Sequence, residues 1–317
     1  MTVSLIDGNY EIGGFVFGTR DPRRNPNPYL VESLDITPGT LITGMGGNLS
    51  ASSGGSGGTN TADASLPNED GQKFGQDYYT GMILTFNINV WQRHQQVYDK
   101  IGSLKGVWRR REFRQTSNLV TTLRMCRGGR TRLVYGRPRN FKESYGEVEQ
   151  GWSPITADFQ CADEHFYSDD LQVRTIGIDN PPVNGLALPT TVPFSLQQFQ
   201  ESYTTVRVRG DAPTWPMIEI FGPCANPVIS YDNKWTIKLL AELNHTQSIT
   251  IDPRPWIRLT LKRGVGIQNI SGKYTVDSPT MKQIRMDPGQ HTIVYRATDP
   301  SLTSYINVNW RDAYLTP

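Results

Sequence analysis

The sequence predicts a mainly β protein with two domains, an N-terminal β-rich domain with one helix and a C-terminal antiparallel β-sandwich. The chain has 317 residues, long enough for two domains of ordinary size. Its 30 glycines and 21 prolines suit a turn-rich β protein. Short segments of alternating apolar and polar residues recur through the second half at the spacing of sandwich strands.

The N-terminal domain is predicted to span residues 1–170 and to carry a flexible insertion. Residues 1–36 have the pattern of short strands broken by turns such as Asp7-Gly8. The Gly/Ser tract Gly44–Gly58 cannot offset its ordering entropy by burial, so residues 40–75 are predicted to form a surface insertion. A phosphate-binding loop is disfavoured there, because no Gly-Lys-Ser/Thr ends the tract and no strand leads into it.

The clearest predicted elements of this domain are a strand and the helix that follows it. Apolar residues alternate over Met82–Trp91, which predicts a half-buried strand. Over Arg93 to about Arg110 they recur at helical spacing, at Val97, Ile101, Leu104 and Trp108. The helix contains Gly102 and Gly106, each of which costs about 1 kcal/mol relative to Ala, so it should depend on packing against a sheet.

The stretch from Leu133 to Asp170 is predicted to close the domain. A strand over Thr131–Tyr135 pairs with Leu119–Met125 and ends at Gly136-Arg137-Pro138. A charged loop follows, and alternation resumes over Ile155–Cys161. Residues 171–205 are then expected to be a linker or extended arm. Within them Gln172–Ile178 has a strand-like pattern, whereas Asp179–Pro193 holds four prolines and little periodicity.

The sandwich is predicted to span residues 206–317. Strands are expected at the following segments: Trp215–Phe221, Val228–Tyr231, Trp235–Leu240, Ser248–Ile251, Trp256–Leu261, Thr280–Met286, His291–Tyr295 and Ser304–Trp310. Turn signals such as Asp252-Pro253 and Asp287-Pro288-Gly289 separate them.

Positive charge is concentrated in one segment of the chain. Residues 93–142 hold fourteen Lys/Arg against Asp99 and Glu112, a formal charge of +12; since the whole chain carries +2, the remainder carries −10. A nucleic-acid surface is one interpretation of the cluster around Arg109, Arg110, Arg111 and Arg114. A solvated face, or an interface with an acidic neighbouring subunit, is favoured, because few aromatic residues are interleaved for base stacking.

No catalytic, metal-binding or cofactor-binding motif is found, so the sequence does not predict an enzyme. The four histidines lie far apart, and the three cysteines, Cys126, Cys161 and Cys224, are predicted to be reduced and buried. No apolar run approaches the roughly 18 residues of a membrane span. No signal peptide is recognised at Met1–Ser4.

Carbohydrate binding is the alternative function. Trp215, Trp235 and Trp256 all fall in the predicted sandwich, and aromatic rings can stack on sugars. Tryptophans in a β-sandwich are more often core or interface residues. A sugar-binding module in host-surface adhesion would be a monomer or small oligomer with glycan affinity.

The ordered set of segments resembles the distal tail, or minor tail, proteins of long-tailed bacteriophages. The segments are Asp70–Val90, the helix ending near Val107-Trp108-Arg109, Gly136–Arg139 with Ile155–Asp170, and Pro216–Ile229 with Ser248–Arg254 and Met286–Tyr295. The Gly/Ser tract departs from a compact member of this family.

This resemblance implies a fold, a location and partners. It implies an N-terminal ring-forming domain, usually hexameric, and a C-terminal galectin-like β-sandwich. The ring would join the tail tube protein to the tail-tip hub or baseplate and let DNA pass. The protein would then be made in the host bacterial cytoplasm and reside at the tail tip of the virion.

A ring needs a head-to-tail surface that closes. We expect the basic cluster at Arg109, Arg110, Arg111 and Arg114 to contact acidic surface of the next subunit. Charge reversal at the first three should then weaken assembly and make it salt-sensitive.

Overall fold

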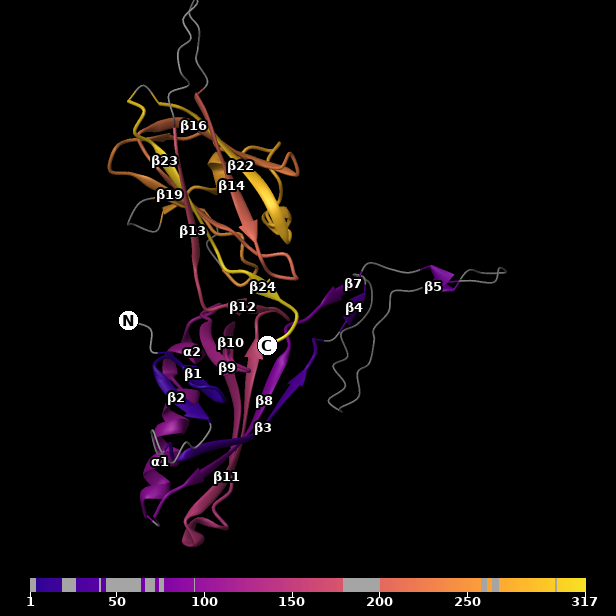
Figure 1. Ribbon diagram of the computed structural model, residues 1–317, viewed down its shortest axis with the longest axis vertical. Coiled ribbons are helices and arrows are strands. Elements are labelled where there is room, and N and C mark those ends of the chain that lie inside the picture. The colour runs from indigo at the N-terminus through magenta and orange to yellow at the C-terminus, as the bar shows by residue number, and fades with distance from the viewer. Residues whose placement is uncertain are drawn as a thin grey trace, which may run out of the picture. The chain divides into compact units, whose positions relative to one another are not determined.

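The computed structural model divides into two compact units, each mainly β (Figure 1). Unit 1 comprises Met1–Asp169 with Leu315–Pro317, and unit 2 comprises Asp170–Tyr314. The structure describes residues 4–18, 27–39, 41–43, 64–65, 72–73, 77–93, 95–178, 200–257, 261–263, 268–299 and 301–317. Most of the predicted insertion, residues 40–75, lies outside these ranges.

The strands of unit 1 are β1 (Asn9–Ile12), β2 (Phe15–Gly18), β3 (Tyr29–Thr37), β4 (Leu41–Thr43), β5 (Ala64–Ser65), β6 (Gln72–Lys73), β7 (Asp77–Tyr79), β8 (Ile83–Trp91), β9 (Thr121–Arg127), β10 (Arg130–Glu143), β11 (Trp152–Cys161) and β12 (Phe166–Ser168). Its helices are α1 (Gln95–Trp108), α2 (Arg111–Gln115) and the 3-10 turn η1 (Val148–Gln150). The predicted strand at 82–91 and the predicted helix at 93–110 are confirmed, while α2 was not predicted.

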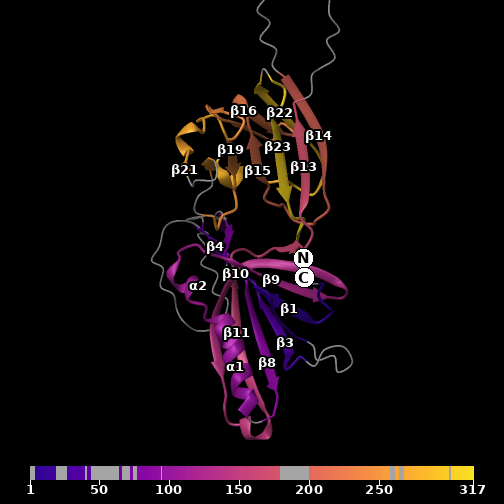
Figure 2. The same cartoon turned by 90° about the vertical axis from the view of Figure 1, so that its left-hand side faces the viewer.

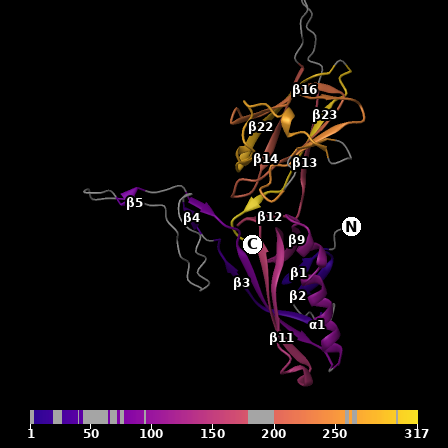
Figure 3. The same ribbon diagram turned by 180° about the vertical axis from the view of Figure 1, so that it is seen from behind.

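One antiparallel sheet organises unit 1. Its strands follow the order β2-β1-β9-β10-β11-β8-β3, with β12 paired to β10. Helix α1 runs along one side of this sheet (Figures 2 and 3). The apolar stripe of α1 is buried, as the spacing predicted, at Val97, Ile101, Leu104 and Trp108. Packing on the sheet therefore offsets the low helix propensity of Gly102 and Gly106, which lie on the open side of the helix with no neighbour near a Cβ.

Strand β10 corrects one expectation. The sequence predicted its end at Gly136-Arg137-Pro138, but the strand continues to Glu143 and pairs with β11 along the way. The register shifts between Pro138 and Phe141, so the proline lies at a bulge, where strands tolerate it. Gly136 is required by close packing, because a Cβ there would lie 2.2 Å from the Gln160 carbonyl oxygen.

Unit 2 contains the strands β13 (Gln172–Gly177), β14 (Gln200–Val208), β15 (Met217–Phe221), β16 (Cys224–Tyr231), β17 (Trp235–Lys238), β18 (Glu242–Leu243), β19 (Ser248–Ile251), β20 (Leu261–Arg263), β21 (Gln268–Asn269), β22 (Gly289–Thr298), β23 (Tyr305–Trp310) and β24 (Ala313–Tyr314). Two 3-10 turns, η2 (Ser271–Lys273) and η3 (Met281–Gln283), lie before β22. The predicted strand at 280–286 is wrong, because η3 occupies it. The predicted strand at 256–261 falls partly outside the described residues.

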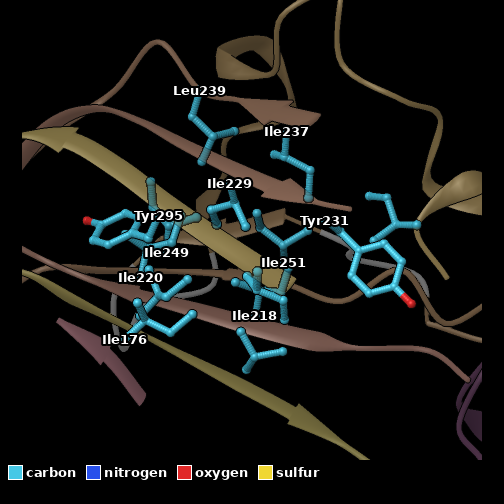
Figure 4. Close-up of a cluster of buried hydrophobic side chains, with 14 of the residues drawn as sticks. Ile176, Ile218, Ile220, Ile229, Tyr231, Ile237, Leu239, Ile249, Ile251 and Tyr295 are labelled. Carbon is cyan, nitrogen blue, oxygen red and sulfur yellow. The ribbon is translucent and has the colours of Figure 1, made fainter. Parts of the chain in front are cut away.

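Two antiparallel sheets form a sandwich in unit 2, as predicted. One has the order β13-β23-β15-β19-β20-β21; the other has the order β14-β22-β16-β17, with β18 paired to β16. Apolar side chains from both sheets meet in one buried core (Figure 4). Ile218 and Ile251 come from the first sheet, whereas Ile229 and Tyr295 come from the second, and each is at most 1% exposed. Alternation along the strands thus produces the inward face of both sheets.

Strands lie at both ends of the segment predicted as a linker at 171–205, and β13 confirms the strand-like pattern at Gln172–Ile178. Strand β13 pairs with β23, and β14 pairs with β22 along nine residues, from Gln200 opposite Ala297 to Val208 opposite Gly289. The paired residues are 128–138 positions apart for β13 and β23 and 81–97 positions apart for β14 and β22, and local periodicity does not show such pairing. Residues 179–199, including the four prolines, lie outside the described part of the chain.

Within the described residues, no helix has the length and apolar character that crossing a membrane requires.

Candidate functional site

The C-terminal end of α1 is fixed to the sheet by Trp108. Its side chain is 2% exposed and packs edge-on against Phe17 and Phe86, with ring centroids 5.8 and 6.0 Å away. The indole Nε1 donates a hydrogen bond of 3.0 Å to the carbonyl oxygen of Asp158 on β11. The two arginines that follow Trp108 therefore leave the helix at a defined place above β10 and β11.

Arg109 and Arg110 diverge from this point. The Arg109 guanidinium donates to the carbonyl oxygen of Phe141 at 3.4 Å. The Arg110 guanidinium donates to the carbonyl oxygen of Gly13, in the turn between β1 and β2, also at 3.4 Å. Neither arginine makes an ion pair within 4.0 Å among the described residues, although the charge of Arg109 contributes to lowering the pKa of Glu143.

Arg137 holds α2 against β10. Its guanidinium donates to the carbonyl oxygens of Phe113 at 3.1 Å, Thr116 at 2.8 Å and Leu119. These carbonyls lie at the end of α2 and just beyond it, where a helix leaves acceptors unsatisfied. Burial, and then the neighbouring charge of Arg139, lower the pKa of Arg137. That second cause indicates a locally positive potential.

These elements surround a pocket of about 620 Å³, which we call the basic pocket. Helices α1 and α2 form one wall, and the bulged segment of β10 together with β11 forms the other. It is lined by Trp108, Arg109, Arg110, Phe113, Arg137, Pro138, Arg139, Asn140, Phe141, Lys142, Thr156 and Asp158. Five of these side chains are cations and one is an acid.

The one carboxylate of the basic pocket is already bound. Asp158 accepts a hydrogen bond from the Thr85 hydroxyl at 2.9 Å and one from the Asn140 side-chain amide at 2.8 Å. Lys105 and Glu143 form an ion pair, and neither belongs to the lining of the pocket. The pocket therefore has a surplus of positive charge.

The structure brings together only part of the predicted arginine cluster. Arg109 and Arg110 line the basic pocket, whereas Arg111 is exposed on α2 and does not. Arg114 belongs to α2, but its side chain lies outside the described part. Sequence reasoning missed Arg137, Arg139 and Lys142, because only the extension of β10 and its pairing with β11 place them beside the helix end.

The three tryptophans proposed as a sugar platform are buried. Trp215, Trp235 and Trp256 are 8%, 7% and 7% exposed. The Arg285 guanidinium lies 4.4 Å from the Trp215 ring, and Trp235 stacks on Tyr231 with centroids 5.0 Å apart. A sugar-binding platform needs ring faces open to solvent, so these positions suit core packing better.

Other chemically reactive side chains do not assemble into a site in the described ranges. Cys126, Cys161 and Cys224 are all free and buried, as the sequence predicted. Burial raises the pKa of the Cys161 and Cys224 thiols, which disfavours the reactive thiolate. No three His, Cys, Asp or Glu side chains of the described residues gather as metal ligands would.

Comparison with known proteins identifies the fold. No family model and no curated protein matches the sequence. Among solved structures, the chain is similar to "SPP1 Dit (gp 19.1) Protein, a Paradigm of Hub Adsorption Apparatus in Gram-positive Infecting Phages", with a TM-score of 0.55 and 14% identity over 95% of this chain and 97% of that one. The chain has the fold of a phage distal tail protein. This confirms the resemblance seen in the sequence at the level of fold.

A second similar structure is a chain of the phage P2 baseplate in its activated conformation with calcium. Its TM-score is 0.48 at 10% identity, over 95% of this chain and 97% of that one. At these identities, neither comparison transfers individual residues of the basic pocket.

Proposed function

We propose that the protein is a structural component of a phage tail tip. Its subunits form a ring, most simply of six chains, that joins the tail tube to the tail-tip hub or baseplate and leaves a lumen for DNA. The observation that carries the proposal is the likeness to SPP1 Dit, which spans both units and covers 95% of this chain. In this proposal unit 2 is a galectin-like domain of the tail tip.

The described residues support a role in assembly rather than catalysis. The lining of the basic pocket is mostly cationic, and its one carboxylate, Asp158, accepts hydrogen bonds from Thr85 and Asn140. Such a surface suits contact with an anionic partner. The thiols are buried. Carbohydrate binding has less support, because the tryptophans that suggested it face the interior of unit 2.

The solution mass of the purified chain tests the proposal. We expect light scattering to give a multiple of the 35.6 kDa subunit, and electron micrographs of the same peak to show closed rings. If the chain alone stays monomeric, the measurement is repeated with the tail tube protein as template. A chain that stays monomeric in both conditions contradicts the ring. Glycan binding by that monomer would then favour the adhesion module.

A further inference from the structure

Four of the five cations of the basic pocket make no ion pair among the described residues. Arg137 is committed to three carbonyl oxygens of the same unit. Arg109, Arg110, Arg139 and Lys142 make no ion pair within 4.0 Å in the described ranges, although other cations of unit 1 do. Like charges gathered around one concave site repel one another, so an anion supplied from outside would be bound favourably.

The shape of the pocket favours side-chain carboxylates over nucleic acid. Surfaces that bind the nucleic-acid backbone spread their cations along a groove or stripe. Here the cations surround a concavity of about 620 Å³ whose walls include Trp108, Phe113 and Phe141. A protruding Asp or Glu can enter such a site and accept the paired N–H groups of an arginine, a strong and directional contact.

The chain itself carries acids of this kind at the β3 edge of the sheet of unit 1. Strand β3 is the edge of the sheet, three strands away from β10 in the order β10-β11-β8-β3. Glu32 and Asp35 on β3 are both exposed, and neither makes an ion pair in the described part of the chain. Glu32 lies at the register shift between Val31 and Ser33, and its carboxylate accepts a hydrogen bond from the side-chain amide of Asn89.

We propose that the basic pocket of one subunit binds the carboxylates of Glu32 and Asp35 on the β3 edge of a second copy of this chain. The inference rests on the proposed ring and specifies its contact. A head-to-tail ring requires two different, complementary surfaces on each subunit, and here these are the basic pocket and the acidic β3 edge.

Charge reversal followed by charge exchange tests this contact. The double variant Arg139→Glu/Lys142→Glu alters two exposed side chains, so it should fold, and its thermal unfolding checks this. We expect at least about a tenfold higher concentration for half-assembly by light scattering. The variant Glu32→Lys/Asp35→Lys should raise the concentration for half-assembly by a similar factor. The quadruple variant, or an equimolar mixture of the two double variants, should assemble as the wild type does.

The matched control is Arg130→Glu/Lys282→Glu, which reverses two exposed cations outside the pocket. It should assemble like the wild type. Rings that form at unchanged concentration in both pocket and edge variants overturn the contact and leave the proposed function standing. If the quadruple variant does not assemble at the wild-type concentration, the pairing of the pocket with β3 is wrong.

Two other outcomes are equally decisive. A wild-type chain that never self-associates, alone or on the tail tube, overturns the contact together with the ring. Duplex DNA binding that is lost in Arg139→Glu/Lys142→Glu while rings persist assigns the pocket to nucleic acid, and therefore also overturns the contact.

Discussion

Asp299 shows how one buried carboxylate can organise a turn. The residue is 2% exposed and follows β22. Its two oxygens accept hydrogen bonds from the backbone N–H groups of Ser301 at 2.9 Å, Thr303 at 2.8 Å and Ser304 at 2.7 Å, and from the Ser301 hydroxyl at 2.7 Å. Burial alone would raise the pKa of Asp299, but these donors outweigh it and lower the pKa below the ordinary 3.8.

The variant Asp299→Asn should therefore destabilise unit 2 at neutral pH. An amide offers one acceptor oxygen where the carboxylate offers two, so we expect a loss of about 1–3 kcal/mol in the free energy of unfolding at pH 7. Because the folded-state pKa is lowered, the wild-type advantage is complete above the unfolded pKa and declines as the pH falls through the folded pKa. Urea unfolding should therefore show a smaller difference in the free energy of unfolding between wild type and variant at pH 3 than at pH 7.

Asp277→Asn is the control for this experiment. Asp277 belongs to the same unit, but its side chain is 78% exposed and 3.8 Å from Lys238. Its replacement should change the free energy of unfolding by less than about 1 kcal/mol at either pH. An equal loss in both variants would mean that net charge, rather than the turn held by Asp299, causes the effect.

At the scale of elements, local patterns predict the type of a segment and which of its faces is buried. They do not predict the strand lengths and pairings that depend on neighbouring strands. The predictions for α1 and β8 are confirmed, because an element that buries one face repeats its apolar residues at the period of a helix or a strand. The pattern predicts that the strand ends at Gly136-Arg137-Pro138, but Gly136 is explained by close packing and Pro138 by a bulge within the longer strand. The sequence predicts a charged loop after Pro138, whereas β10 continues to Glu143. The pattern therefore does not predict that Arg139 and Lys142 line the basic pocket.

Helix α2 illustrates an element that its own sequence does not stabilise. It has five residues, and its N-cap residue Arg110 makes no side-chain capping hydrogen bond. A helix this short is unstable in isolation. The forked guanidinium of Arg137 satisfies the carbonyls at and beyond its C-terminal end, so a residue of β10 stabilises α2.

Replacement of the Arg137 guanidinium should destabilise α2 locally. Lysine keeps the charge of Arg137 but cannot donate to three carbonyl oxygens in one plane. We expect Arg137→Lys to speed hydrogen exchange at least about tenfold in peptides covering residues 111–120, an opening free energy lower by about 1.4 kcal/mol or more. Arg130→Lys, at the exposed first position of β10, should leave this exchange unchanged. Unchanged exchange in Arg137→Lys would mean that α2 is held by other contacts.

At the scale of the whole molecule, each unit has its own core, which predicts two separate unfolding transitions. Fully buried side chains fill both units, such as Phe86 in unit 1 and Ile251 in unit 2, each with 0% exposure. Domains with their own cores generally fold as units, and chains built from them depart from a single two-state transition. Scanning calorimetry of the wild type should resolve two heat-absorption components.

Cavity-creating variants assign the two components. Ile251→Ala should cost unit 2 about 2–5 kcal/mol and Phe86→Ala should cost unit 1 about 3–5 kcal/mol, because each leaves a void in a close-packed interior. For units of this size each kcal/mol lowers Tm by about 2–4 °C, so Ile251→Ala should lower the Tm of its own component by about 4 °C or more and Phe86→Ala by about 6 °C or more. The other component should stay in place. If Ile251→Ala moved both components by the same amount, the units would unfold as one cooperative body, and the independence inferred from their separate cores would be wrong.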